Sequence, residues 1–453
     1  MKRKRVLLSA VAALVLLAMS ACGRGATVTE LSVVPEPVFM VQKEGSYTLH
    51  SNIKLSVAGI GQNSPTLKYV TKALRSARFR PSLVSASQDS DVELVLNDTL
   101  NPELGDEGYL LEVRSGGIRL SANSGAGLLY GCQTLLQMLP ADVTRVSYAT
   151  VSLPECTILD HPCYGWRGVA VDDSCGVLGA KFMRRLVDAM SLYKLNRLRL
   201  RPPADADSED VAGVVEYAAS RNVAVEVMDS CGWAMETDTV FCVNGFYEGL
   251  ERAREGCVVV MSPSDYCSYN RYQADARYQP AADAGVVTLS RVYGFKPVPE
   301  GTAARLAEMV AGACGRYTAK AGSDARGAEY MLLPRMLALA EVLWSPAEVR
   351  DWSRFRRKVE VQKDRLAAHG YSYCEGSFTP LFAARRVDET TMNIEVSTEV
   401  PNTYIFYTTD GSTPTRESAV YIGPVNLQRG THIKLLPVYK GVDRDSVYEF
   451  VIK

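Results

Sequence analysis

The feature that most limits the fold of this chain is a short join between two strand-like segments. The sequence from Val225 to Gly245 reads VEVMDSCGWAMETDTVFCVNG, with one apolar, β-branched run ending at Asp229 and a second beginning near Thr239. Two parallel strands of one sheet need a crossover of a dozen or more residues, usually with a helix. Only about ten residues separate these runs, and they lack a convincing helical repeat. A regular strand–helix–strand unit therefore does not fit between them.

Around this join, strand-like and helix-like segments alternate over residues 157–373. The strand-like runs are WRGVAVDD, LNRLRLR, VAVEVMD, TVFCVN and CVVVMSP, and the helix-like segments include AKFMRRLVDAMSLYK and EDVAGVVEYAASR. Such alternation predicts a parallel sheet or barrel.

Two further predicted domains flank this central one. Residues 28–155 mix strands with helices, and the segment YLLEVRSGGIRLSAN predicts a hairpin that turns at Gly116–Gly117. That pattern is typical of an α+β domain. Residues 378–453 contain strand and turn patterns, such as NTYIFYTTDGSTPT and GTHIKLLPVYKG, which predict a small β-sandwich.

Residues 1–22 resemble the signal peptide of a bacterial lipoprotein. MKRKR is a basic n-region, and the apolar stretch after it ends in small residues and Cys22. We expect Cys22 to be lipidated, which anchors a soluble body to the membrane without spanning it. The alternative is an ordinary signal peptide with an incidental cysteine. The expected location is the bacterial cell envelope, at the outer membrane or on the periplasmic face.

Charge and composition exclude some partners. The formal net charge is −1, whereas a nucleic-acid partner normally requires a basic face, so we expect no nucleic-acid partner. The four histidines are scattered, so we expect no metal site, and we predict no cofactor. Disulfide pairing among the cysteines cannot be read from the sequence.

Several segments, in order along the chain, resemble glycoside hydrolase family 20, the β-N-acetylhexosaminidases. They are EGYLLEVRSGGIRLSANSGAGLLYGCQTLLQML, YGWRGVAVDDS with LVDAMSLYKLNRL, VVVMSPSDYC, VYGFKPVPEG, EYMLLPRMLALAEVLWSP and YTTDGSTPT. The resemblance covers nearly the whole mature chain. It implies an α/β fold, with an incomplete (β/α)8 TIM-like barrel between an N-terminal α+β domain and a C-terminal β-sandwich.

The resemblance also implies glycoside hydrolysis by an Asp-Glu pair, and the loss of that pair in this chain. In that family an adjacent Asp-Glu pair ends the fourth barrel strand, and the substrate's own 2-acetamido oxygen is the nucleophile of a retaining mechanism. The Asp orients the acetamide, and the Glu is the general acid. Here the interval that would carry the pair is the short join, which implies that the fourth and fifth strands and their helices are deleted. Glu236 and Asp238 lie in the join but are not adjacent, so they are weak candidates, and we assign no catalytic residue.

Other positions of the family's sugar pocket also differ. Arg199 and Arg201 stand at two histidine positions of the second strand, and Trp233 stands at the histidine that ends the third. The Tyr-x-Asp of the seventh strand is Ser268-Tyr269-Asn270, and the Trp-x-Glu of the eighth aligns with Thr318-Ala319-Lys320.

Asp172 and two further positions of that pocket are retained. Arg167 matches the family's hydroxyl-binding arginine, and Asp229 matches the acidic end of the third strand. We predict both as substrate-binding residues, and the alternative for Arg167 is a structural ion pair. Residues Met331 to Trp344 read as an apolar helix of the core.

The sequence therefore predicts an envelope lipoprotein of the hexosaminidase family that binds or acts on N-acetylhexosamine glycans and is catalytically impaired. A missing general acid alone removes a factor of roughly 10²–10⁴. One alternative is an active retaining exo-β-N-acetylhexosaminidase with substituted catalytic residues. Another is the non-functional remnant of a deleted gene, because a six-stranded remainder exposes sheet edges unless the gap closes.

Overall fold

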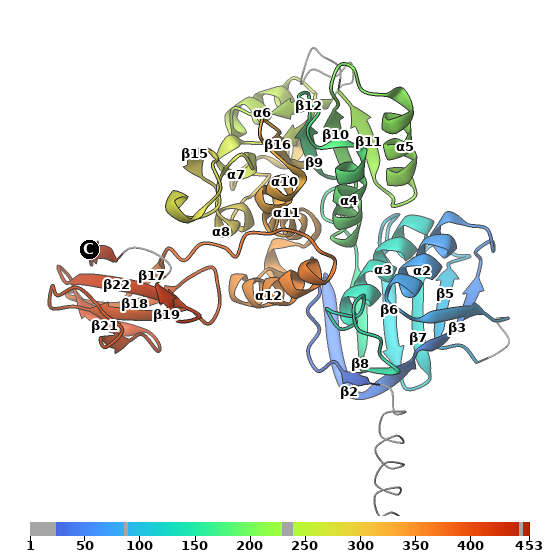
Figure 1. The fold of residues 1–453 in the computed structure, drawn as a ribbon, viewed down its shortest axis with the longest axis horizontal. Helices are drawn as coiled ribbons and strands as arrows, with labels where there is room; N and C mark the ends of the chain where they lie inside the picture. The colour runs from blue at the N-terminus through green and yellow to red at the C-terminus, as the bar shows by residue number, and fades with distance from the viewer. Residues whose placement is uncertain (1–23, 86–88, 229–238, 444–446) are drawn as a thin grey trace, which may run out of the picture. The chain divides into compact units, whose positions relative to one another are not determined.

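A computed structural model describes residues 24–85, 89–228, 239–443 and 447–453. Two compact units make up the chain (Figure 1). The first runs to Cys163 and includes Ser220–Asn222 and Asp364–Gly370. The second contains Tyr164–Ala219, Val223–Lys363 and Tyr371–Lys453.

The first unit is built on an eight-stranded sheet with the order β1-β8-β6-β7-β5-β3-β4, and β2 pairs with β8. The strands are β1 (Gly25–Thr27), β2 (Phe39–His50), β3 (Asn52–Ala58), β4 (Arg80–Leu83), β5 (Val92–Leu96), β6 (Tyr109–Arg114), β7 (Gly117–Ala122) and β8 (Thr150–Asp160). Helices α2 (Pro65–Ser76) and α3 (Gly125–Met138) lie against this sheet (Figure 1). The predicted hairpin is confirmed as the antiparallel pair β6–β7. Strand β8 continues past residue 155, because it pairs with β6 as far as Asp160.

The second unit contains a six-stranded, all-parallel sheet with the order β11-β10-β9-β16-β13-β12. Its strands are β9 (Trp166–Asp172), β10 (Arg197–Arg201), β11 (Ala224–Val227), β12 (Thr239–Cys242), β13 (Val258–Met261) and β16 (Val310–Thr318). Helices α4 (Gly179–Leu192), α5 (Ser208–Ala219) and α6 (Phe246–Arg254) connect them. This order is that of an eight-stranded barrel that lacks its fourth and fifth strands, as the sequence predicts.

The gap in the barrel lies between β11 and β12. Strand β11 ends at Val227 and β12 begins at Thr239, so residues 228–238, eleven positions, separate them. A complete βαβ unit needs roughly 30 residues or more, so two βα units do not fit. Within the described ranges no backbone ladder joins β11 to β12, and these two strands are the ends of the sheet.

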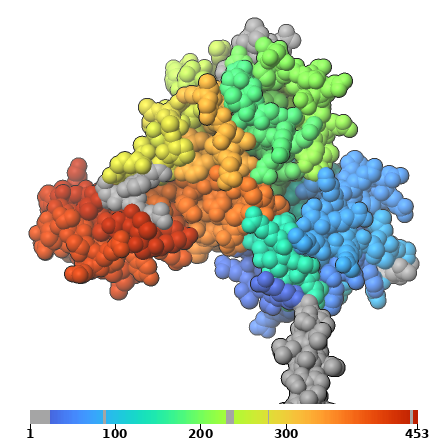
Figure 2. All heavy atoms as spheres, in the orientation of Figure 1, coloured from blue at the N-terminus to red at the C-terminus, as the bar shows by residue number. Residues whose placement is uncertain are grey.

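The sheet is curled, because side chains from distant strands meet on its inner face. Trp166 of β9 and Phe241 of β12 pack edge to face, with ring centres 5.3 Å apart. They share a buried cluster with Ala170, Val260 and Cys314, from β9, β13 and β16. The barrel residues, green to orange in Figure 2, pack into a continuous body. The interior of the shortened barrel therefore contains a packed apolar cluster.

The outer side of the sheet is covered by α10 (Ala325–Leu332) and α11 (Arg335–Trp344), whose contacts include β16 and, for α11, β9. The prediction of one helix from Met331 to Trp344 is wrong in detail. Proline lacks the N–H that continues a helix, and it disfavours helical geometry in the residue before it. Accordingly, α10 ends at Leu332 and α11 begins after Pro334. Every residue of α11 is buried, as expected for a core helix.

The remaining elements of the second unit include a β-rich C-terminal region. Around the barrel lie α7 (Ser264–Cys267), β14 (Arg271–Tyr272), β15 (Asp283–Val286), α8 (Leu289–Tyr293), α9 (Ala304–Ala307) and α12 (Trp352–Ala368), whose last turn belongs to the first unit.

The C-terminal sheets have the orders β17-β18-β21 and β20-β19-β22-β23, with β24 on β22. Their strands are β17 (Leu381–Arg386), β18 (Thr391–Ser397), β19 (Tyr404–Thr408), β20 (Ala419–Val420), β21 (Val425–Gln428), β22 (His432–Tyr439), β23 (Val442–Asp443) and β24 (Tyr448–Val451). The two sheets pack on one buried core, as in the predicted sandwich, and this core includes Ile394, Ile405 and Ile433.

Candidate functional site

The candidate site is the carboxyl edge of the parallel sheet, where barrel enzymes carry their active-site groups. Asp172 ends β9 and Arg201 ends β10, and the two residues are neighbours in the ladder. Arg201 Nη1 lies 3.3 Å from Asp172 Oδ2, and the Ser174 N–H donates to Asp172 Oδ1 at 3.0 Å. This retained carboxylate is thus held by an arginine that stands at a family histidine position.

The next carboxylate along the chain is also committed to internal contacts. Asp173 is 2 % exposed, and its carboxylate accepts the backbone N–H groups of Val177, Leu178 and Gly179 at 2.9–3.2 Å. These bonds order the loop that leads into α4. Asp173 therefore acts as a structural cap, and its oxygens face the protein backbone.

Arg199 of β10 and Glu226 of β11 form a second ion pair, which lies farther from the carboxyl edge of the sheet. Arg199 Nε lies 3.2 Å from Glu226 Oε2, and Trp166 Nε1 donates to Glu226 Oε1 at 3.4 Å. The Arg199 guanidinium also lies 3.5 Å from the centre of the Phe241 ring. Burial lowers the pKa of Arg199, and the charge of Glu226 opposes that shift. Sequence reasoning missed Glu226, although a single charge in the apolar run VAVEVMD was the available signal.

Asn270, where the family pattern has an aspartate, is bound to the end of β16. Its Nδ2 donates to the Thr318 carbonyl at 2.7 Å, and its Oδ1 accepts the Thr318 N–H at 2.8 Å. Lys320, where the pattern has a glutamate, forms an ion pair with Asp283. Both substituted positions therefore take part in contacts within the protein.

Arg167 lies on the opposite side of β9 from Trp166 and Ala170. It is fully buried, and it donates from Nε to the Lys194 carbonyl at 3.0 Å and from Nη1 to the Tyr164 carbonyl at 2.7 Å. Its guanidinium stands 4.9 Å from the ring centre of Trp344 in α11. These contacts join β9 to the covering helices, and sugar binding by Arg167 stays a prediction.

The other predicted site residues lie outside the described residues. They are the substrate-binding candidate Asp229, the weak catalytic candidates Glu236 and Asp238, and the lipidation site Cys22. The structure therefore does not test their roles or bring them together with Arg167.

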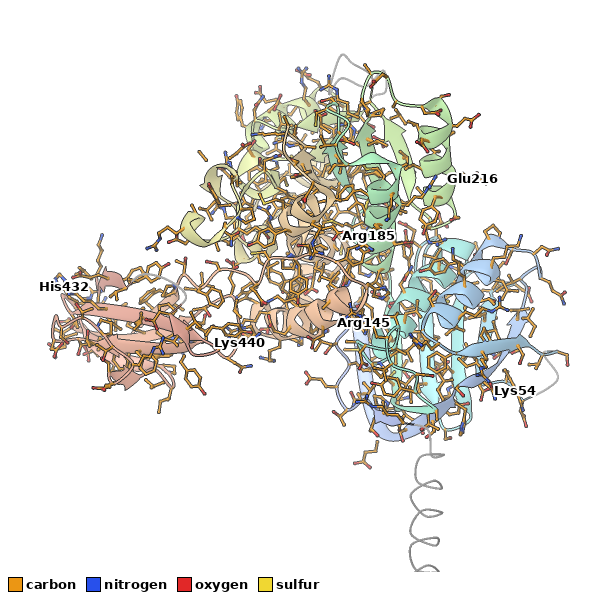
Figure 3. All side chains as sticks on the ribbon, viewed as in Figure 1. Lys54, Arg145, Arg185, Glu216, His432 and Lys440 are labelled. Carbon is orange, nitrogen blue, oxygen red and sulfur yellow. The ribbon has the colours of Figure 1, made fainter. Side chains whose placement is uncertain are left out.

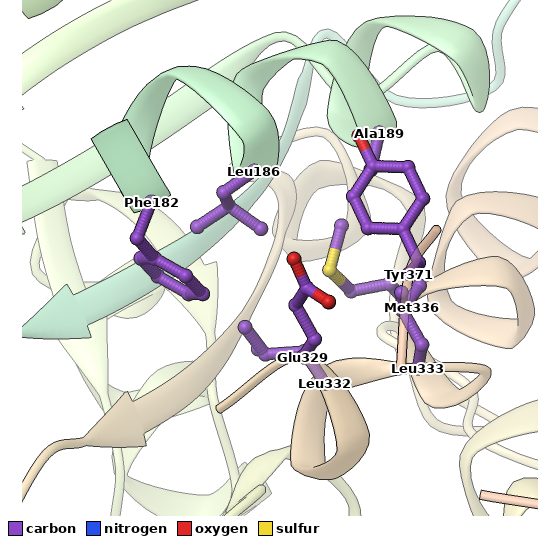
Figure 4. Close-up of a pocket in the computed structure, with 8 residues that line it drawn as sticks. All are labelled: Phe182, Leu186, Ala189, Glu329, Leu332, Leu333, Met336 and Tyr371. Atoms are coloured by element: carbon purple, nitrogen blue, oxygen red, sulfur yellow. The ribbon is translucent and has the colours of Figure 1, made fainter. Parts of the chain in front are cut away.

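A small crevice on the helical side of the sheet does not resemble a sugar site. It lies between α4 and α10–α11, and its apolar walls include Phe182, Leu186 and Met336 (Figure 4). Its volume of about 10 Å³ is close to the minimum for one water molecule. Its carboxylate, Glu329, accepts from Arg185 Nε and from the Ser372 N–H, each at 2.8 Å. Arg185 is labelled in Figure 3.

Metal binding and membrane insertion can be judged for the described part of the chain. No group of three or more histidine, cysteine, aspartate or glutamate residues there is arranged to hold a metal ion. Likewise, none of the helices in those ranges has the length and hydropathy needed to cross a membrane.

Three protein-family models match the chain. "Glycosyl hydrolase family 20, domain 2" matches residues 30–161, and "Glycosyl hydrolase family 20, catalytic domain" matches residues 244–347. The third, "Fn3 associated", matches residues 394–451. The catalytic-domain match begins just after the short join.

The chain is also similar to curated β-hexosaminidases. It is 21 % identical to a β-hexosaminidase of Porphyromonas gingivalis, over 94 % of this chain and 76 % of that protein. It is 27 % identical to β-hexosaminidase subunit A2 of Dictyostelium discoideum, over 43 % of this chain and 40 % of that protein. The first alignment spans 597 positions, more than the 453 residues of this chain. A substantial part of that relative therefore has no counterpart here.

Solved structures with the same fold include two bacterial hexosaminidases. The Streptomyces plicatus N-acetyl-β-hexosaminidase in complex with Thio-NAglucal aligns with a TM-score of 0.66 at 20 % identity, over 76 % of this chain and 97 % of that chain. An inactive mutant of a Vibrio harveyi GH20 exo-β-N-acetylglucosaminidase aligns with a TM-score of 0.66 at 15 % identity, over 77 % of this chain and 79 % of that chain. At these identities the alignments establish the fold alone.

Proposed function

Since this chain belongs to glycoside hydrolase family 20, the hexosaminidase family of hydrolases, we propose that it recognises N-acetylhexosamine-containing glycans but cleaves them poorly or not at all. The observation that carries this proposal is the join of eleven residues between β11 and β12. In the family pattern, that interval contains the strand whose end supplies both the general acid and the residue that orients the acetamide. Removing the acid alone costs a factor of roughly 10²–10⁴ in rate.

The contacts at the carboxyl edge of the sheet and just inside it support the same proposal. Asp172 is bound to Arg201, Glu226 to Arg199, and Asn270 to the backbone of Thr318. A retaining glycosidase needs two carboxyl groups across the sugar from each other, and in this family one of them positions the substrate's acetamide. In this chain, Asp172 and Glu226 are each paired with a different arginine of β10, and such pairing favours structural roles for both carboxylates.

The packed barrel interior argues against the alternative of a poorly folding remnant. Trp166, Phe241 and Val260 come from three strands and are each at most 8 % exposed. Burying a large side chain stabilises the fold by about 1.5–3 kcal/mol. A sheet that keeps such a core after losing two strands is compatible with a folded, binding-competent protein.

We further propose that the protein is a lipoprotein of the bacterial cell envelope, anchored through Cys22. The basic n-region, the apolar stretch and the small residues before Cys22 support this proposal. Mass spectrometry of the mature N-terminus is expected to find acyl chains on Cys22. Replacement by Cys22→Ser is expected to release the protein from membrane pellets. An unmodified cysteine, or a mature N-terminus elsewhere, would contradict the anchor.

Glycan recognition is tested by calorimetry with neutral N-acetylglucosamine oligosaccharides, with the same samples analysed afterwards for released monosaccharide. The proposal predicts saturable binding with the oligosaccharide recovered intact. Absence of binding would contradict recognition, and stoichiometric release of N-acetylglucosamine would contradict the loss of hydrolysis.

A further inference from the structure

Two arginines converge on α7, the single helical turn that follows the carboxyl end of β13. Arg316 of β16 donates from Nη2 to Ser264 Oγ at 2.9 Å and to the Ser262 carbonyl at 3.3 Å. Arg271 of β14 places Nη1 3.1 Å from Asp265 Oδ1. Because Ser264 and Asp265 are consecutive, the two guanidinium groups are anchored within one turn of each other.

A third arginine reaches the same turn from α8. Arg291 donates from Nε to the Asp265 carbonyl at 3.3 Å, and its guanidinium lies 4.4 Å from the centre of the Tyr266 ring. Phe295 stacks on that ring with centres 5.2 Å apart, and Phe246 packs edge to face against it at 6.0 Å. The aromatic stack therefore orients an exposed arginine against the same turn that the other two arginines contact.

Of the contacts just described, only that of Arg271 with Asp265 pairs an arginine with a carboxylate. The acceptors of Arg316 and Arg291 are a hydroxyl and carbonyls, which are neutral, and the carboxylate of Asp265 is bound to Arg271. Burial lowers the pKa of Arg316, and the nearby charge of Arg271 lowers it further. Like charges that repel one another in this way are stabilised by a bound anion.

The residues around this cluster favour an anion as well. Asn270 and Lys320 stand where the family pattern has an aspartate and a glutamate, so neither position now carries a negative charge, and Lys320 is paired with Asp283. Gly285 has φ +98°, and a Cβ there would stand 3.3 Å from Arg271 Cδ. The glycine thus lets the Arg271 side chain lie directly against β15, which holds it in position.

We propose that Arg271, Arg291 and Arg316 form a binding site for an anionic substituent of a glycan, a sulfate ester or a uronate carboxylate. The planar guanidinium group offers paired N–H donors that match both kinds of oxyanion. The side chain of Arg271 is 29 % exposed and that of Asp265 is 70 % exposed, so the cluster is open to solvent. The inference rests on the proposed recognition of N-acetylhexosamine glycans and adds that acidic glycans of this class bind more tightly than neutral ones.

The test measures binding of three N-acetylglucosamine oligosaccharides of equal length, one neutral, one sulfated and one carrying a uronate, at constant ionic strength. The double variant Arg271→Gln/Arg291→Gln is expected to bind the acidic ligand about tenfold more weakly, because charge-assisted hydrogen bonds are lost. Asp265→Asn is expected to bind it more tightly, because a competing carboxylate is removed. Whichever of the sulfated and uronate-bearing oligosaccharides binds more tightly identifies the substituent that the site recognises.

The matched control is Arg252→Gln/Arg254→Gln on α6, which removes the same charge from exposed arginines paired with glutamates. It is expected to leave acidic-ligand binding within about twofold of wild type, since exposed ion pairs contribute little. Equal affinity for the neutral and acidic ligands, or an equal loss in the control, would overturn the site while leaving glycan recognition intact. Binding of none of the three ligands would overturn both proposals.

Discussion

The Arg199 guanidinium lies over the ring of Phe241, 3.5 Å from its centre. Arg199 belongs to β10 and Phe241 to β12, so this contact joins the two sides of the gap through the interior of the sheet. Backbone pairing does not join β11 to β12 in the described part of the chain. Side-chain packing in the interior therefore contributes to holding the shortened sheet in its curled form.

The first prediction concerns that packing. Phe241→Ala is expected to lower the free energy of unfolding by about 3–5 kcal/mol, the usual cost of emptying a buried aromatic site. Phe241→Leu keeps most of the volume and is expected to cost less. Urea denaturation followed by circular dichroism measures both. A loss below about 1 kcal/mol for Phe241→Ala would mean that the interior contact does not stabilise the sheet.

A second prediction concerns Arg335, which is fully buried at the start of α11. It donates to the carbonyls of Met331, Arg271, Val287 and Tyr269 at 2.7–3.0 Å. Arg335→Met keeps much of the shape but leaves these buried carbonyls without a donor, each at a cost of about 1–3 kcal/mol.

The expected loss for Arg335→Met is therefore about 3 kcal/mol or more, measured by thermal or urea unfolding. Arg335→Lys keeps a charge but cannot span the same carbonyls, so an intermediate loss is expected. Near-native stability of the methionine variant would show that these hydrogen bonds contribute little.

Cysteine reactivity supplies a third prediction. The nine cysteines in the described residues have free thiols, of which Cys163 and Cys175 are exposed and Cys267 and Cys314 are fully buried. Burial raises the pKa of Cys314 to about 12, which lowers the fraction of reactive thiolate. At pH 8, iodoacetamide is expected to modify Cys163 and Cys175 first, as measured by peptide mass spectrometry. In urea, all four should react at similar rates, and fast native labelling of Cys314 would contradict the packed interior.

A fourth prediction follows from Asn270. Asn270→Asp restores the family residue, but a carboxylate cannot donate to the Thr318 carbonyl that now accepts from Nδ2. We expect a stability loss of about 1–2 kcal/mol and no gain in hydrolysis. Asn393→Asp, at an exposed asparagine pair in the sandwich, is the matched control and should change stability less. Increased turnover in Asn270→Asp would show that this position limits catalysis.

Much of the fold follows from local sequence patterns. Alternation of apolar strands with amphipathic helices predicts the parallel sheet, and the short join predicts its missing strands. The break at Pro334 was also readable locally, but the continuous apolar pattern from Met331 to Trp344 concealed it. The contact of Arg199 with Phe241 was not predictable, because it depends on how far the whole sheet curls.

The site was less predictable than the fold, for a related reason. The sequence identifies which family residues are replaced at Arg201, Asn270 and Lys320, but it cannot show their new partners. Those partners, Asp172, Thr318 and Asp283, are distant in sequence and meet only at the sheet edge. The arginines around α7 are likewise dispersed, over residues 271–316, and no motif marks them as a group.

The most direct test of the missing catalytic strand is steady-state hydrolysis of an aryl N-acetyl-β-glucosaminide by the purified wild-type chain and by Glu236→Gln and Asp238→Asn. The account predicts rates at the level of a buffer blank for all three proteins. Clear wild-type turnover that either substitution abolishes would contradict it, because the short join would then contain a working carboxylate.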